Sequence, residues 1–289
     1  MSYRFRLQLS TCFSFFMLHI SRMLSDSRPI AVFDSGIGGL TVVAALMEAL
    51  PQESFVYLGD TARLPYGNKT PETLIKYSLE IAQFLLKQNV KAIVVACNTA
   101  SAYALSHLQA AFDVPVLGVI EPGAKAALRV TRSKHIGVIG TYGTIKSNAY
   151  EQAITALDKA AKVYSQACPL FVPLVEEAWL EEEASELIAR KYLSAFDEYP
   201  LDTLVLGCTH YPLLIPLLRK VIGEKVRLVS SAAACAEELK ELLQEKALLA
   251  DVHKKTCRIL TTDHNTWLES LVDKILPADL NAKIETVSL

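Results

Sequence analysis

The sequence predicts an α/β fold of two similar domains, each built on an open, mainly parallel sheet. From Pro29 onward, short apolar runs alternate with amphipathic stretches. Several runs are continuously apolar, which is typical of strands buried on both faces of a parallel sheet. A weak internal repeat points the same way, because each half places a cysteine directly after a buried strand, at Cys97 and at Cys208. In both halves another strand is in place 19 residues later, at Val116 and at Arg227.

The elements follow from these runs and from the signals between them. The expected strands are Ile30–Phe33, Phe55–Leu58, Ala92–Val95, Val116–Val119, Ile136–Ile139, Leu170–Val172, Leu204–Leu206, Arg227–Val229 and Arg258–Thr261. The clearest helical stretch carries Leu74, Tyr77, Ile81, Phe84 and Leu85 on one face. It begins with Thr70 as N-cap and Pro71 in the first helical position. Strand-helix alternation of this kind is the signature of an open α/β sheet.

The first 27 residues differ from the rest of the chain. Arg4 and Arg6 precede a moderately apolar run over Leu7–Ile20, which superficially resembles a signal peptide. Polar residues interrupt the run, and no small-x-small cleavage site follows it. It is also too short and too polar for a membrane span. We expect residues 1–27 to be an extension, disordered or preceding a true start at Met23, with export as the alternative and no membrane as partner.

Composition limits the function classes. The chain is 51% hydrophobic and 21% charged, which is normal for a globular protein. The chain has 29 Lys and Arg and 31 Asp and Glu, and none of its basic stretches is long enough to follow a phosphate backbone. Nucleic acid is therefore not expected as the main partner. Six cysteines in 289 residues are too few for a disulfide scaffold. We therefore expect free thiols in a reducing compartment.

The residues after Cys97 raise it above an ordinary core cysteine. Asn98, Thr99 and Ser101 are polar groups at a strand-to-helix turn, where unpaired backbone N–H groups can bind a carboxylate. The same field is expected to lower the thiol pKa.

Cys208 repeats this arrangement, with Thr209 and His210 beside it. Open α/β sheets bind ligands at the carboxyl ends of their strands. Two facing halves would therefore place the two thiols on opposite walls of one cleft. Zinc binding by the two cysteines and His210 is the weaker interpretation, because no Cys-x-x-Cys pair exists and the ligand set is incomplete.

The glycine-rich turn over Asp34–Gly39 has two interpretations. A dinucleotide fingerprint needs Gly-x-Gly-x-x-Gly, but Thr41 stands at the third glycine position, although Asp60 would suit a ribose contact. The other interpretation is that Ser35 and the turn's N–H groups hold a small anionic substrate, with Asp34 near a thiol. The segment over Leu64–Asn68 is either a plain loop or a substrate wall.

Six motifs together closely resemble those of bacterial glutamate racemase. They are Ala31–Gly39, Pro65–Gly67, Ala96–Ala100, Gly140–Thr144, Pro173–Glu176 and Gly207–Pro212. The resemblance implies an isomerase that interconverts L- and D-glutamate with no cofactor or metal, and an active site in the cleft between two domains. We expect the first domain over residues 28–121 and 234–289 and the second over residues 122–233. Ser230-Ser231-Ala232 departs from the Asp-Ser-Gly-like turn that is usual in the family.

The resemblance also implies a role for each site residue. Cys97 would act on D-glutamate and Cys208 on L-glutamate. Asp34 and His210 would assist the thiols, with Glu176 on the His210 side. The expected substrate contacts are Asp34, Ser35, Tyr66, Gly67, Asn98, Thr99, Thr141, Thr144, Thr209 and His210.

The same resemblance implies a cytoplasmic role, supplying D-glutamate for peptidoglycan and so for cell-wall biogenesis and cell shape. Activation by the cell-wall precursor UDP-N-acetylmuramoyl-L-alanine is left open, as is the oligomeric state, with a homodimer among the alternatives. Three rival functions are an aspartate racemase on the same scaffold, a Cys-His hydrolase with Cys208 as nucleophile, and a non-catalytic binding module.

Overall fold

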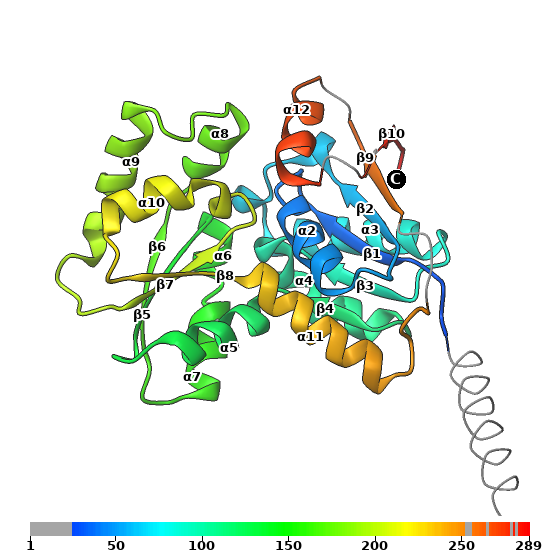
Figure 1. Cartoon of the computed structure of the whole chain (residues 1–289), viewed down its shortest axis with the longest axis horizontal. Coiled ribbons are helices and arrows are strands. Elements are labelled where there is room, and N and C mark those ends of the chain that lie inside the picture. The colour runs from blue at the N-terminus through cyan, green and yellow to red at the C-terminus, as the bar shows by residue number, and fades with distance from the viewer. Residues whose placement is uncertain (1–24, 252–255, 264–265, 278–279, 281–282) are drawn as a thin grey trace, which may run out of the picture.

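The computed structural model describes residues 25–251, 256–263, 266–277, 280 and 283–289. Two parallel sheets lie side by side and confirm the predicted fold class (Figure 1). The six-stranded sheet has the order β10-β9-β2-β1-β3-β4, and the four-stranded sheet has the order β6-β5-β7-β8. The first 24 residues, with Cys12 and most of the expected extension, lie outside the described part.

The bounds of the elements are as follows. The strands are β1 (Ile30–Asp34), β2 (Phe55–Gly59), β3 (Ala92–Val95), β4 (Val116–Gly118), β5 (His135–Gly140), β6 (Lys162–Ala167), β7 (Thr203–Gly207), β8 (Arg227–Ser230), β9 (Cys257–Thr261) and β10 (Lys283–Thr286). The α-helices are α2 (Leu40–Ala49), α3 (Pro71–Leu86), α4 (Asn98–Ala111), α5 (Ile120–Val130), α6 (Tyr142–Lys146), α7 (Ala149–Leu157), α8 (Phe171–Glu176), α9 (Glu183–Leu193), α10 (Ile215–Ile222), α11 (Ser231–Glu245) and α12 (Thr266–Ile275). Short 3-10 helices are η1 (Thr61–Arg63), η2 (Tyr66–Asn68), η3 (Ser194–Phe196) and η4 (Tyr211–Leu214).

Strand β1 is central to the first sheet and pairs with β2 on one side and β3 on the other. Because side chains alternate along a strand, Val32 packs with α2 and α11 whereas Phe33 packs with α3 and α4. Helix α3 begins as predicted, since the Thr73 N–H donates to the N-cap hydroxyl of Thr70 at 3.3 Å. Helices therefore cover both faces of this sheet, and the strand ends at one edge are left for a site.

The chain passes between the sheets twice. It leaves the first sheet after β4 into α5, and it returns from β8 into α11, where the Ser230 hydroxyl accepts from the Ala232 N–H at 3.3 Å. The two connecting helices pack together, with Lys125 and Glu238 paired at 3.0 Å. Strand β9 then joins the first sheet beside β2. The expected domain boundaries fall inside α5 and α11 and stay a prediction.

Two parts of the strand assignment differ from the prediction. The expected strand at Leu170–Val172 is wrong, because Phe171 begins the short helix α8. The strand that precedes this helix is β6, a half-exposed edge strand whose polar side chains interrupt any apolar run. Strand β10, at one edge of the six-stranded sheet, was not predicted either.

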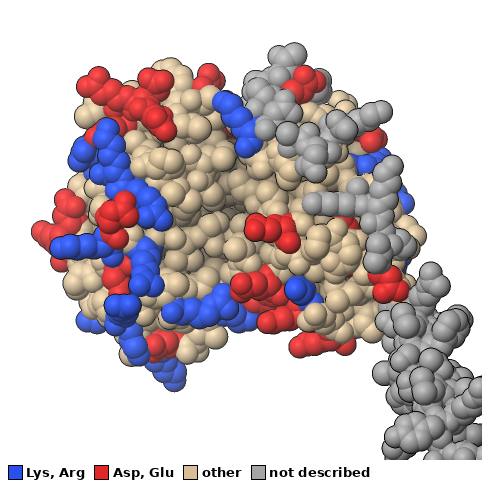
Figure 2. All heavy atoms as spheres, viewed as in Figure 1, with Lys and Arg blue, Asp and Glu red and all other residues tan. Residues whose placement is uncertain are grey.

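The surface carries charges of both signs. On the face shown in Figure 2, Lys and Arg side chains are interspersed with Asp and Glu over the half that contains α9 and α10. The surface above the junction of the two halves is mostly uncharged in the same view. In the described part of the chain, no helix is long and apolar enough to cross a membrane.

Candidate active site

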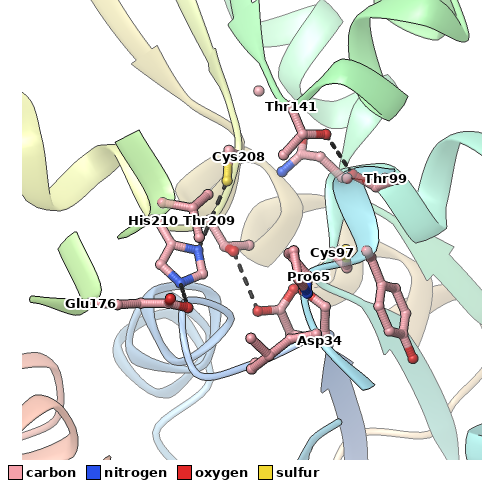
Figure 3. Close-up of a pocket in the computed structure, with 17 residues that line it drawn as sticks. Asp34, Pro65, Cys97, Thr99, Thr141, Glu176, Cys208, Thr209 and His210 are labelled. Carbon is pink, nitrogen blue, oxygen red and sulfur yellow. Dashed lines mark hydrogen bonds and ion pairs between the residues drawn. The ribbon is translucent and has the colours of Figure 1, made fainter. Parts of the chain in front are cut away.

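A pocket of about 30 Å³ lies between the two halves, at the carboxyl ends of β1, β3 and β7 (Figure 3). All the predicted site residues except Thr144 line it. Cys97 follows β3 in the first half and Cys208 follows β7 in the second, so both thiols reach the same pocket from different sheets. This is the arrangement that the internal repeat predicts.

The Cys97 thiol caps the N-terminus of α4, where its Sγ accepts from the Ala100 N–H at 3.5 Å. Burial, and then the carboxylate of Asp34, raise the pKa of Cys97 far above its ordinary value. The Ala100 N–H and the Ser35 hydroxyl act in the opposite direction but do not outweigh burial. The expected lowering of this pKa is therefore wrong, and Cys97 is a protonated thiol at neutral pH.

On the other wall, His210 lies between a thiol and a carboxylate. Its Nδ1 is 3.9 Å from Sγ of Cys208, and its Nε2 is 3.4 Å from Oε1 of Glu176 (Figure 3). Burial lowers the pKa of His210, but the interactions with Cys208 and Glu176, and the charge of Asp34, outweigh it and raise the pKa to about 10. A positively charged imidazole therefore lies beside Sγ of Cys208, whereas the carboxylate of Asp34 acts on Cys97. The two thiols therefore have different electrostatic environments.

Besides Nε2 of His210, which contacts Glu176 at 3.4 Å, two buried polar atoms of the lining residues have no hydrogen-bond partner among the described residues. Oδ1 of Asp34 is one, whereas Oδ2 accepts from the Gly39 N–H at 2.9 Å and from the Thr209 hydroxyl at 3.4 Å. The other is Nδ2 of Asn98, whose Oδ1 accepts from the Tyr150 hydroxyl at 2.7 Å. An anionic acceptor and an amide donor left over in one pocket match the ammonium and carboxylate groups of an amino acid.

The glycine-rich turn lets the second half approach the first. A Cβ on Gly38 would lie 2.5 Å from Nδ1 of His210, so only glycine fits there.

The dinucleotide interpretation does not hold for Asp60, because both of its carboxylate oxygens already accept from protein groups. Oδ2 accepts from Arg63 at 2.7 Å and from the Tyr66 hydroxyl, and Oδ1 accepts from Thr262 at 2.9 Å.

Comparison with known proteins decides the family. The sequence model of the Asp/Glu/hydantoin racemase family matches residues 40–239. The glutamate racemase of Geobacter metallireducens is 55% identical over 222 residues, which are 77% of this chain and 82% of that protein. The chain belongs to the glutamate racemases.

Solved structures agree with this assignment. A glutamate racemase isoform from Bacillus anthracis aligns with a TM-score of 0.87 and 42% identity, covering 91% of this chain and 98% of that one. The glutamate racemase of Francisella tularensis, solved in complex with D-glutamate, aligns with a TM-score of 0.84 and 40% identity, over 91% and 98% of the two chains. The chain is thus an amino-acid racemase, which is an isomerase.

Within this racemase, some predicted residues take a different place from the one expected. Thr144 lies behind the pocket wall, with its Oγ1 3.0 Å from that of Thr99 and 3.1 Å from that of Thr141. Thr99 and Thr141 line the pocket and join the two halves, with their hydroxyls 2.8 Å apart. The hydroxyl of Tyr66 donates to Asp60, so Tyr66 contributes only its ring and backbone to the pocket.

Several lining residues of the racemase were not predicted as site residues. Leu64 and Pro65 show that their loop is a wall of the pocket, and Val172 reaches it from α8. Gly36 and Gly207 complete the lining. Pro65 belongs to a recognised motif and could have been found there, whereas no sequence signal marked Val172. Among the described residues, no cluster of three or more His, Cys, Asp or Glu could hold a metal ion.

Proposed function

We propose that this racemase interconverts L- and D-glutamate without a cofactor, with one of the thiols of Cys97 and Cys208 taking the α-proton and the other delivering a proton to the opposite face. The observation that carries the proposal is the position of the two thiols, which follow equivalent strands of the two halves and line one pocket. Racemisation removes a proton from one face of the α-carbon and returns one to the other. Two groups on opposite walls can do both without turning the substrate over.

Each direction of the proposed reaction starts with one cysteine as thiolate and the other as thiol. In the direction from L-glutamate, Cys208 acts as the thiolate and takes the α-proton, next to the His210 ring that Glu176 contacts from the other side. Cys97, which burial and Asp34 hold protonated, then delivers its proton to the opposite face. After this turnover Cys97 is the thiolate, stabilised by the Ala100 N–H and Ser35, and Cys208 is the thiol. That form is ready for D-glutamate.

The remaining polar groups hold the substrate. Oδ1 of Asp34 would accept from the α-ammonium group, and Nδ2 of Asn98 would donate to the α-carboxylate, where negative charge grows as the proton leaves. Thr99, Thr141 and Thr209 would supply further hydroxyl contacts. About 30 Å³ holds little more than two or three water molecules, so we infer that the halves separate to admit glutamate and close again around it.

The proposed role of the product is the supply of D-glutamate for peptidoglycan in the cytoplasm, as the resemblance implies. The structure of the Escherichia coli glutamate racemase, 28% identical to this chain, contains L-glutamate and the activator UDP-MurNAc-ala. The same precursor is the first compound to test here for activation. A homodimer stays a prediction.

Racemisation in heavy water tests the mechanism. With L-glutamate in D₂O, early D-glutamate should carry deuterium at the α-carbon while the remaining L-glutamate stays largely unlabelled, which proton NMR and chiral chromatography measure together. Cys97→Ala and Cys208→Ala should each abolish net racemisation. Cys235→Ala, a buried thiol of α11 in the core of the first half, is the matched control and should keep it. Mostly unlabelled first product, or racemisation by either cysteine variant, would show that the two-thiol mechanism is wrong.

A further inference from the structure

We propose that Tyr150 is a positioning residue of the reaction, which fixes the side-chain amide of Asn98 so that its Nδ2 faces the substrate carboxylate. This inference rests on the proposed function and deepens it. Tyr150 lies outside the recognised motifs, and it does not line the pocket.

Tyr150 belongs to one half of the molecule and acts on the other. It is the second residue of α7, and its ring is 2% exposed and packs in the core of the second half with Ile154 and Val138. Its hydroxyl reaches across to the first half and donates to Oδ1 of Asn98 at 2.7 Å. Asn98 is the first residue of α4, next to Cys97, and is itself 2% exposed.

This hydrogen bond determines which end of the amide is left for a ligand. A side-chain amide has an acceptor oxygen and a donor nitrogen, and the tyrosine hydroxyl occupies the oxygen. The nitrogen, Nδ2, is buried and has no partner among the described residues, although Asn98 lines the pocket. A buried donor without a partner is costly unless a ligand completes it. Without the hydroxyl, the amide could turn over and present its oxygen to the carboxylate, which would repel it.

The ring also contacts the other thiol-bearing turn. A Cβ added to Gly207, the residue before Cys208, would lie 3.1 Å from Cε2 of Tyr150. The hydroxyl has a second hydrogen-bond neighbour in Ser231, where the chain returns to the first half. One side chain therefore stands between the residue after the first cysteine and the residue before the second.

Tyr150→Phe removes the hydroxyl and keeps the ring. We expect kcat to fall about tenfold in both directions, with a smaller change in KM, because the lost orientation matters most when charge develops on the carboxylate. Proton transfer should also become more rate-limiting, so the isotope effect with α-deuterated glutamate should increase. The matched control is Tyr103→Phe, since the Tyr103 hydroxyl also joins the two halves, at 3.1 Å, but to the backbone carbonyl of Gly143. It should lower the melting temperature as much as Tyr150→Phe does and leave kcat and the isotope effect unchanged.

A double variant tests whether Tyr150 acts through Asn98. If it does, Asn98→Ala combined with Tyr150→Phe should have the kcat of Asn98→Ala alone. Multiplied losses, or equal kcat in Tyr150→Phe and Tyr103→Phe, would overturn the positioning role. Failure of the proposed function looks different, because Cys97→Ala or Cys208→Ala would then keep racemising glutamate.

Discussion

The hydroxyl of Thr209 lies 3.4 Å from Oδ2 of Asp34, so the turn that carries Cys208 touches the carboxylate beside Cys97 across the junction of the two halves. The same carboxylate oxygen accepts from the Gly39 N–H at 2.9 Å. The relative position of the two walls is therefore set where the glycine-rich turn meets the turn after β7. Changes at this contact should affect catalysis more than stability.

Gly38→Ala tests this contact. The new Cβ would lie 2.5 Å from Nδ1 of His210 and 2.6 Å from Oγ1 of Thr209, so the second wall must move away. We expect kcat to fall at least about tenfold, as a displacement of catalytic groups by a fraction of an ångström can cause. The melting temperature should change little, because the two halves can separate slightly.

Gly137→Ala is the contrasting variant. Its Cβ would lie 2.8 Å from Cδ1 of Leu204 inside the second sheet, so differential scanning calorimetry should show a lower melting temperature while the folded protein keeps its kcat. Wild-type activity in Gly38→Ala would contradict the proposed role of the contact.

The stability that His210 contributes should depend on pH. Its pKa is raised in the folded protein to about 10, against about 6.5 in an unfolded chain. A raised pKa stabilises the folded state fully below pH 6.5, and this contribution is lost as the pH rises toward 10. Urea unfolding of wild type and His210→Gln between pH 6 and pH 10 should show a difference in unfolding free energy that shrinks with pH. A difference independent of pH would mean that His210 is neutral in the folded protein.

Lys91→Met should be strongly destabilising. Lys91 Nζ lies 2.6 Å from Oε2 of Glu53, both side chains are buried, and Nζ also donates to the carbonyls of Asp26 and Leu248. Removing the lysine ammonium leaves the Glu53 carboxylate buried without its ion-pair partner, which lowers the free energy of unfolding by about 3–5 kcal/mol. Adding Glu53→Gln should recover part of this loss, because the amide oxygen can still accept from the Ala250 N–H. A loss below about 1 kcal/mol in urea unfolding would contradict this account.

Glutamate should be strongly preferred over aspartate. A missing methylene alone costs about 1–3 kcal/mol, and a side-chain carboxylate held away from its buried donors costs more. We expect kcat/KM for aspartate, measured by chiral chromatography, to be at least about 100-fold lower than for glutamate. Similar values for the two amino acids would contradict the preference and leave the two-thiol mechanism standing.

Periodicity predicted those elements that are buried on both faces. Ile30–Phe33 and Ala92–Val95 are apolar throughout, and the structure places both as adjacent strands of one sheet. Periodicity does not reveal β6, because it is an edge strand with an exposed Ser165 and a half-buried Gln166. The apolar run at Leu170–Val172 predicts a strand wrongly, because three residues are too few to show a period.

The site was predictable where residues follow a strand or match a motif, as Cys97 and Cys208 do. It was not predictable where a contact depends on how the two halves face each other. The bond from Tyr150 to Asn98 joins residues 52 positions apart. The high pKa of Cys97 depends likewise on burial and on the carboxylate of Asp34, which the residues around Cys97 in the sequence do not reveal.

The late return of β9 to the first sheet has a consequence for synthesis on the ribosome. The strands of the second sheet all lie between His135 and Ser230, so this sheet can form as soon as that segment has emerged. Strand β2 keeps an unpaired edge until Cys257–Thr261 arrives, and such edges promote association between nascent chains. The first half is therefore completed only after the whole segment that forms the second half has been synthesised.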